Sequence, residues 1–207
     1  MENGKLAYSV YILTKRKEII IMSKKLLIMI PGHAFTTGDP YPICTRQDGF
    51  SNLFDKVTTL SYKGTKDGAS IVQQTAEIVK LIREAAKGYD EVVLMGNSAG
   101  GYHAVMAAKD ILFANKFKKA ANRTNITKIV GISSAAIPSL AVSYVLKNTP
   151  IFAIHAENDT TVPVAMARAF AAAVSSTILM TDSSLGHNTM GIIDKYVKEI
   201  REFMERG

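Results

Sequence analysis

Short apolar segments alternate with segments of helical periodicity along most of this 207-residue chain. The first clear apolar segment, residues 25–30, is uninterrupted after Lys25, as is typical of strands that are buried on both faces. Parallel strands need a crossover connection, and a helix usually supplies it. The alternation therefore predicts an α/β protein, a three-layer α/β/α sandwich with a mostly parallel central sheet.

Turn and capping residues set the boundaries of these elements. Ser70 with Gln73 forms a capping box at the start of the first helix, and Gly88 is a natural stop after it. Residues 34–52, rich in glycine, proline and aspartate, are predicted to form a long loop. The predicted strands are 25–30, 57–62, 91–95, 126–132, 150–155 and 177–180. Two helices are predicted to begin near residues 71 and 99. Three more are predicted over residues 137–147, 164–174 and 192–203.

Residues 1–24 support two interpretations. In one, the apolar runs 7–13 and 19–22 add a β-hairpin to the edge of the sheet. In the other, Met22 is the true start of the protein, and the residues before it form an extension with little structure. In both, the folded domain is expected to span residues 25–207.

The net charge of +7 is unevenly distributed. Residues 1–25 hold six basic and two acidic side chains. No nucleic-acid motif and no stacking pattern of aromatic residues accompanies the basic residues, so we expect a solvated surface and no nucleic-acid partner. A second basic group surrounds a predicted helix end and comprises Lys116, Lys118, Lys119, Arg123 and Lys128.

The apolar runs of the chain are too short for a membrane span. Residues 26–30, for example, fall far below the roughly 20 residues that a spanning helix needs. The apolar stretches of residues 1–25 are interrupted by lysine and arginine, and no secretory cleavage site follows them. The single cysteine, Cys44, cannot form an intrachain disulfide and fits a reducing compartment. The sequence therefore predicts a cytoplasmic protein without a membrane span.

A small-residue segment, Gly96-Asn97-Ser98-Ala99-Gly100-Gly101, directly follows the strand predicted at 91–95 and opens a helix. A sharp strand-to-helix turn strains the serine backbone and exposes its hydroxyl beyond the carboxyl end of the strand. Glycine is needed two positions before and after the serine, because side chains there would collide. The helix N-terminus favours developing negative charge. The context predicts Ser98 as a nucleophile, and the alternative is a turn without chemistry.

A serine hydroxyl is a weak nucleophile and needs a neighbouring base. His187 lies between the last predicted strand and the last helix. Of the four histidines, it alone fits the chain order serine, acid, histidine that accompanies a serine at such a turn. We interpret His33, His103 and His155 as structural or surface residues.

The base needs a carboxylate that fixes its tautomer. Asp159 lies just past the strand predicted at 150–155, at the carboxyl end where ligand sites of open α/β sheets gather. Its alternative role is to cap the helix that follows. Glu157 and Asp182 are rival carboxylates, and we expect Asp159 to be the acid.

A tetrahedral intermediate needs backbone N–H donors. Ala99, the residue after the serine, is expected to supply one of them. The loop after the first strand is expected to supply the other, from His33 first and Ala34 second. The alternative is that Pro31-Gly32 merely ends the strand.

Three segments, in this order along the chain, resemble the α/β-hydrolase superfamily and within it the small esterases and lipase-like hydrolases. They are Pro31-Gly32-His33, residues 96–101, and residues 155–163 together with Gly186-His187. The third is similar to the family's H-G-x-x-D-x-x-V-P acid segment, with Ala156 in place of glycine. Pro31 stands where many members have histidine. The resemblance spans about residues 25–205.

The resemblance implies the α/β-hydrolase fold and a catalytic domain over residues 25–207. It also implies a serine hydrolase that cleaves carboxylic esters of small or medium acyl substrates through an acyl-enzyme on Ser98, with no cofactor and no metal. Many relatives insert a lid domain before the acid, but only the short stretch 137–147 fits there, so we expect no lid domain. The loop aromatics are then either an acyl-pocket wall or ordinary anchors, and they are Phe35, Tyr41 and Phe50.

The expected partner is a small-molecule ester, and the sequence makes no prediction of an oligomeric state. The same triad also serves acyl transfer and the hydrolysis of thioesters or peptides, so these reactions stay open. A binding protein on this fold with an unused triad is the alternative outside the enzymes. The complete triad argues against it, because an unused site tends to lose a member.

Overall fold

The computed structural model describes residues 23–32, 42–63 and 69–206. In this part of the chain, six strands form one sheet in the order β2-β1-β3-β4-β5-β6, and every neighbouring pair is parallel. The strands are β1 (Lys25–Ile30), β2 (Lys56–Thr59), β3 (Glu91–Asn97), β4 (Ile126–Ile132), β5 (Ile151–Ala156) and β6 (Thr177–Asp182). The predicted parallel sheet is therefore confirmed.

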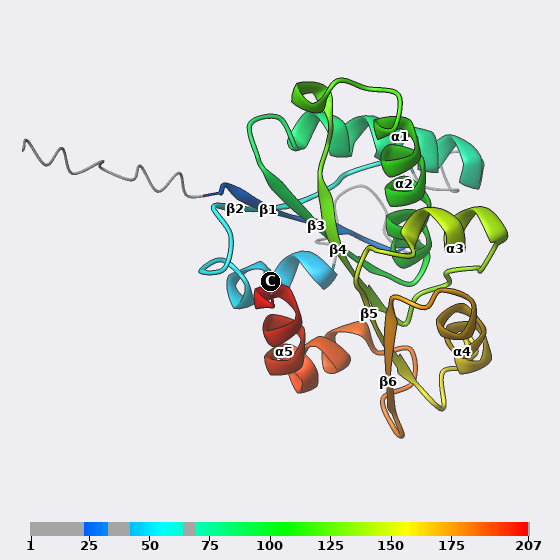
Figure 1. Cartoon of the computed structure of the whole chain (residues 1–207). Helices are drawn as coiled ribbons and strands as arrows, with labels where there is room; N and C mark the ends of the chain where they lie inside the picture. The colour runs from blue at the N-terminus through cyan, green and yellow to red at the C-terminus, as the bar shows by residue number, and fades with distance from the viewer. Residues whose placement is uncertain (1–22, 33–41, 64–68, 207) are drawn as a thin grey trace, which may run out of the picture.

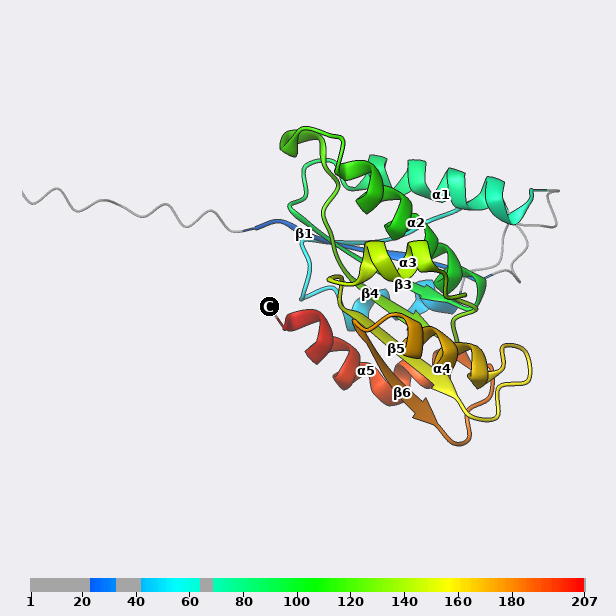
Figure 2. The same ribbon diagram turned by 45° about the vertical axis from the view of Figure 1, so that its right-hand side comes forward.

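Helices cover both faces of the sheet and complete the predicted three layers (Figures 1 and 2). One face packs against the first four α-helices, and the other packs against α5 and the 3₁₀ helix η1. The α-helices are α1 (Ile71–Ala85), α2 (Ala99–Asn115), α3 (Leu140–Leu146), α4 (Val164–Ala173) and α5 (Thr189–Glu205). The 3₁₀ helices are η1 (Pro42–Gly49) and η3 (Ala120–Asn122).

β1 shows why the predicted strands are apolar without alternation. Leu26, Ile28 and Ile30 face the α1 and α2 side, whereas Leu27 and Met29 face the α5 side. All five side chains are fully buried, because successive side chains of a strand point to opposite faces and both faces are covered. Each contributes about 1.5–3 kcal/mol of burial free energy, so the central strands anchor the fold.

The predicted capping box at the start of α1 is present. The Ser70 hydroxyl accepts a hydrogen bond from the Gln73 backbone N–H at 3.2 Å, and the Gln73 side chain accepts one from the Ser70 N–H at 2.8 Å. Gly88 follows the helix with a φ of +80°, which suits glycine at a helix stop.

The prediction of a long loop over residues 34–52 is partly wrong. η1 occupies much of it, and Ile43 and Phe50 are fully buried against the α5 face. Two isolated apolar residues among polar ones produce no helical periodicity, so the sequence did not reveal this packing. Phe50 is a core anchor. Phe35 and Tyr41 lie outside the described residues, as do residues 1–22, so the two interpretations of the N-terminal segment stay predictions.

The connection from β4 to β5 carries α3 alone, and no lid domain is inserted there. α3 begins later than predicted, because Pro138 precedes the Ser139 N-cap, whose hydroxyl accepts from the Val142 N–H at 3.2 Å. No helix in the described ranges is long and apolar enough to cross a membrane.

Lys128 departs from the solvated surface predicted for the second basic group. It lies half-buried on β4, and its ammonium donates a hydrogen bond to the Met204 carbonyl at 2.7 Å and another to the Arg206 carbonyl. Burial lowers the pKa of Lys128 below its ordinary value. This lysine therefore caps the end of α5.

Substituting Ser70 with alanine tests the contribution of the capping box. Because the Gln73 N–H loses its acceptor, Ser70→Ala is expected to lower the free energy of unfolding by about 1 kcal/mol in urea denaturation. Ser70→Asp keeps a capping oxygen and should stay within a few tenths of the wild-type value. Equal stability of the alanine variant and the wild type would contradict this role.

Candidate active site

Ser98 connects the end of β3 to the start of α2 in a strained backbone conformation. Its φ is 52° and its ψ is −124°. Among the described residues, only Ser98 and Ser133 combine a positive φ with a side chain. Such strain costs about 1–3 kcal/mol and persists only where surrounding structure imposes it. Here the Ser98 N–H donates to the Ile132 carbonyl at 3.0 Å, and the Ser98 carbonyl accepts from the Ala135 N–H at 3.1 Å. The end of β4 thus holds the turn.

The glycines around Ser98 are required by close backbone contacts. A Cβ on Gly96 would lie 2.3 Å from the Gly100 carbonyl oxygen, and a Cβ on Gly100 would lie 2.1 Å from the Ile30 carbonyl oxygen. These contacts agree with the steric reason for glycine on both sides of the serine. They also press the first turn of α2 against the end of β1.

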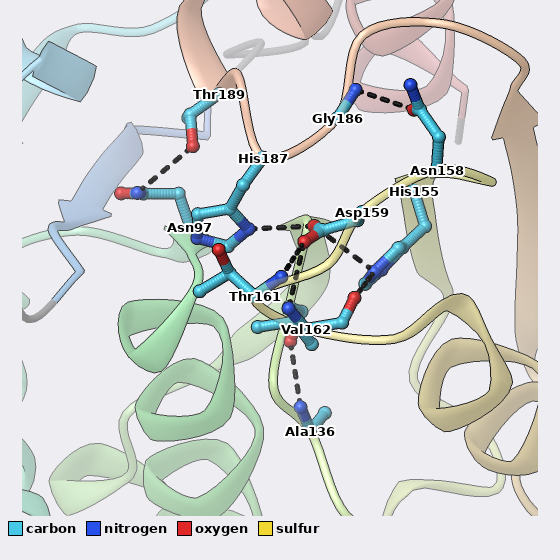
Figure 3. Close-up of polar contacts among 11 residues, drawn as sticks. Asn97, Ala136, His155, Asn158, Asp159, Thr161, Val162, Gly186, His187 and Thr189 are labelled. Carbon is cyan, nitrogen blue, oxygen red and sulfur yellow. Dashed lines mark hydrogen bonds and ion pairs between the residues drawn. The ribbon is translucent and has the colours of Figure 1, made fainter.

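His187 and Asp159 come together from two different loops (Figure 3). His187 Nδ1 lies 2.7 Å from Asp159 Oδ2, and the Asp159 side chain is completely buried. Because a carboxylate only accepts hydrogen bonds, Nδ1 carries the proton and Nε2 is left as an acceptor. About a quarter of the His187 side chain is exposed, at 26%. The pair therefore combines a buried carboxylate with an imidazole that is partly exposed to solvent.

The other oxygen of Asp159 fixes the loop that carries it. Oδ1 accepts hydrogen bonds from the Thr161 N–H at 2.9 Å and the Val162 N–H at 2.8 Å. Asp159 thus caps a turn before α4, while its second oxygen holds His187. Burial alone would raise the pKa of Asp159, but the bonds from Val162, His187 and Thr161 outweigh it and hold the pKa below its ordinary value.

His155 is structural, in agreement with the sequence interpretation. It is almost fully buried, and its Nε2 donates to the Val162 carbonyl at 2.7 Å. The same nitrogen lies 3.5 Å from Asp159 Oδ2, so His155 packs beneath the acid loop (Figure 3). His103 is equally buried, between α1 and α2, and its ring contacts Thr75 and Gln74.

The two rival carboxylates have other partners. Asp182, at the end of β6, forms an ion pair with Lys195 and accepts from the Tyr196 hydroxyl at 2.7 Å. The Lys195 and Tyr196 bonds hold the pKa of Asp182 far below its ordinary value. Glu157 binds Arg168 at 2.6 Å. Asp159 is accordingly the carboxylate that contacts His187 in the described part of the chain.

Sequence reasoning missed Asn158, which joins the acid loop to the histidine loop. Its Oδ1 accepts from the Gly186 N–H at 2.8 Å (Figure 3). Its Nδ2 donates to the Ser184 carbonyl at 3.2 Å. These partners lie 28 and 26 residues away, so no local pattern could reveal them.

The remaining predicted site residues lie at the same edge of the sheet or outside the described ranges. Ala99 is the first residue of α2, where a backbone N–H has no partner within the helix. His33 and Ala34 are outside the described residues, and Gly32 is the last described residue before them. Within the described ranges, the Ser98 hydroxyl forms no hydrogen bond with His187, and no group of three histidine, cysteine or acidic residues could hold a metal.

Comparisons with known proteins identify a family by sequence and a fold by structure. A family model described as phospholipase/carboxylesterase matches residues 54–206. No curated protein matches the sequence.

Solved structures are similar over most of their length. The chain is 17% identical to Est1E from Butyrivibrio proteoclasticus, with 88% of this chain and 87% of that chain covered and a TM-score of 0.68. For mouse alpha/beta hydrolase domain-containing protein 10, the identity is 14%, the coverage 87% and 89%, and the TM-score 0.66. For Thermogutta terrifontis esterase 2, phosphoramylated by tabun, the identity is 16% and the TM-score is 0.61. That match covers 89% of this chain and 86% of that chain. This likeness shows the α/β-hydrolase fold.

The partners of Asp182 predict a pH-dependent contribution to stability. At pH 7, Asp182→Asn is expected to lower the free energy of unfolding by about 2 kcal/mol, because a buried carboxylate loses charge-assisted hydrogen bonds. The pKa of Asp182 is lowered in the folded state, so its contribution is complete above about pH 5 and declines as the pH falls below about 4.

Urea denaturation between pH 3 and 8 measures this difference. The half-exposed Asp194, which pairs with Arg46, is the matched control, and Asp194→Asn should cost less than about 1 kcal/mol. A stability difference between the wild type and Asp182→Asn that grows towards low pH would contradict the assigned role.

Proposed function

The chain belongs to the phospholipase/carboxylesterase family, and on this premise we propose that it cleaves carboxylic esters of small or medium acyl substrates through an acyl-enzyme on Ser98. The observation that carries the proposal is the buried Asp159 carboxylate, 2.7 Å from His187 Nδ1. It supports a proton-free Nε2 at the edge of the sheet where the strained Ser98 turn lies. A serine at such a turn needs a base of this kind.

The reaction follows from the roles of these groups. His187 Nε2 takes the proton of the Ser98 hydroxyl while the serine oxygen attacks the ester carbonyl. The proton then passes to the leaving alcohol as its bond to carbon breaks. Water next attacks the acyl-enzyme carbonyl and gives a proton to His187 Nε2, which returns it to the Ser98 oxygen as the carboxylic acid leaves. Asp159 holds the imidazole by Nδ1 and stabilises its positive charge during the transfer.

The oxyanion of the tetrahedral intermediate needs donors that are in place before the reaction. We assign one donor to the Ala99 N–H, at the first position of α2, and the other to the His33 N–H. The N-terminus of α2 adds its partial positive charge. The short α3 between β4 and β5 supports an open site without a lid.

A fluorophosphonate probe tests the nucleophile. The probe is expected to label the wild type at one serine, and Ser98→Ala is expected to abolish labelling together with ester turnover. The related Thermogutta esterase carries a tabun-derived group, which supports an organophosphorus reagent as the probe.

Ser133 provides a matched control for this experiment. It also has a positive φ and is fully buried, and no other described group bonds its hydroxyl. Ser133→Ala should therefore leave labelling intact. Labelling that survives in Ser98→Ala would refute the assignment of the nucleophile.

Replacing the acid tests the Asp159–His187 pair. Asp159→Asn removes the acceptor that selects the Nδ1–H tautomer, so kcat for a p-nitrophenyl ester is expected to fall by about 10⁴-fold. Asp182→Asn changes a carboxylate that does not contact His187. It should keep kcat within about threefold of the wild type at a temperature where it is folded. Equal losses of kcat in the two variants would rule out a specific role for Asp159.

A further inference from the structure

Asn97, the residue immediately before Ser98, connects two segments that are distant in sequence. It is almost fully buried, with 6% of its surface exposed. Its Oδ1 accepts a hydrogen bond from the Gly32 N–H at 3.1 Å. Its Nδ2 donates one to the Thr189 hydroxyl at 3.3 Å (Figure 3). One carboxamide therefore contacts the loop after β1 and the start of α5, while its backbone is part of the serine turn.

The Gly32 contact holds the first residues after β1, next to the position to which we assign the second oxyanion donor. Gly32 directly precedes His33 in the sequence. A Cβ on Gly32 would lie 3.0 Å from the Asn97 carbonyl oxygen and 3.0 Å from the Ser98 Cβ, so Gly32 lies directly against the serine turn. The Asn97 side chain thus anchors Gly32, the residue just before the assigned donor.

The Thr189 contact fixes the loop that carries the base. Thr189 is the first residue of α5, lies two residues after His187, and is buried. The bond from Asn97 joins this end of the histidine loop to the serine turn. Asp159 and Asn158 hold the same loop from the other side, through His187 and Gly186.

The chemistry of the side chain explains why an amide stands here. Gly32 presents a hydrogen-bond donor and Thr189 presents an acceptor. The short asparagine side chain has both an acceptor oxygen and a donor nitrogen, so it can bond both at once. A carboxylate could not donate, and an apolar side chain would leave both groups buried without this partner. Each such loss carries a desolvation cost.

We propose that Asn97 is a positioning residue that holds Gly32, next to the assigned oxyanion donor, and the His187 loop in place relative to Ser98. The proposal rests on the proposed serine-hydrolase function. Asn97 does not touch the reacting atoms. Its effect is on the distances among groups that act together in the transition state, where a displacement of about 1 Å can cost about 100-fold in rate.

Steady-state kinetics on a p-nitrophenyl ester tests the proposal. Asn97→Ala is expected to lower kcat by about 100-fold while KM changes less than about threefold, because transition-state alignment is lost and substrate binding is kept. Thr189→Val removes one contact at nearly constant volume and should lower kcat by about 10-fold. Thr189→Ser restores a hydroxyl and should recover most of kcat. That rescue keeps the test decisive if Asn97→Ala fails to fold.

Gln74 supplies the control for a purely structural effect. It is a fully buried amide on α1 that bonds the Ala69 carbonyl and His103 and, within the described residues, forms no hydrogen bond with Asn97, Ser98, Gly32 or Thr189. Gln74→Leu should lower the melting temperature without lowering kcat at 25 °C. Wild-type kcat in folded Asn97→Ala, or equal kcat in the two Thr189 variants, would overturn the positioning role alone. A wild type that neither labels with the probe nor turns over any ester would overturn both proposals.

Discussion

The site depends on one steric constraint, the contact between the first turn of α2 and the end of β1. A Cβ on Gly100 would come within 2.1 Å of the Ile30 carbonyl oxygen, so no side chain fits between the helix and the strand. With the helix this close to the sheet, the chain has room for only a sharp turn at Ser98, and the turn requires a positive φ. Backbone bonds to Ile132 and Ala135 then keep the serine in place. The position of the proposed nucleophile thus follows from backbone packing.

The sequence predicted the parts of the fold that have a local physical cause. Strands that are buried on both faces must be apolar throughout, and β1 and β4 have the predicted bounds. The glycines around Ser98 are visible because their steric cause lies within the turn itself. Lys128 and Asn97 were missed, because their partners lie 65 to 92 residues away and impose no period on the sequence. η1 was missed because its buried side chains pack in one cluster with α5, which lies near the other end of the sequence.

Sequence proximity is a poor guide to the partner of His187. Asp182 is only five residues before the histidine, yet it turns towards Lys195 and Tyr196 on α5. Asp159 is 28 residues away and makes the contact, because parallel strands end at one edge of the sheet. The two carboxylates have related physical roles. Each is buried, each closes a turn with backbone N–H bonds, and each uses its second oxygen to hold α5 or the loop before it.

The polar groups of the site lower the free energy of unfolding, and the burial of the apolar strands compensates for this loss. A serine with strained φ costs about 1–3 kcal/mol, and a buried carboxylate or amide is tolerated only when its hydrogen bonds are made. The five fully buried side chains of β1 alone contribute about 1.5–3 kcal/mol each, more than the strain at Ser98. Stability is therefore concentrated in the strands, and the segments at their carboxyl ends hold the groups of the proposed mechanism. Asn97 lies at the boundary between the two, as the last residue of the buried strand β3 and the neighbour of the serine. A polar side chain at that boundary can transmit the rigidity of the sheet to Gly32 and to the start of α5.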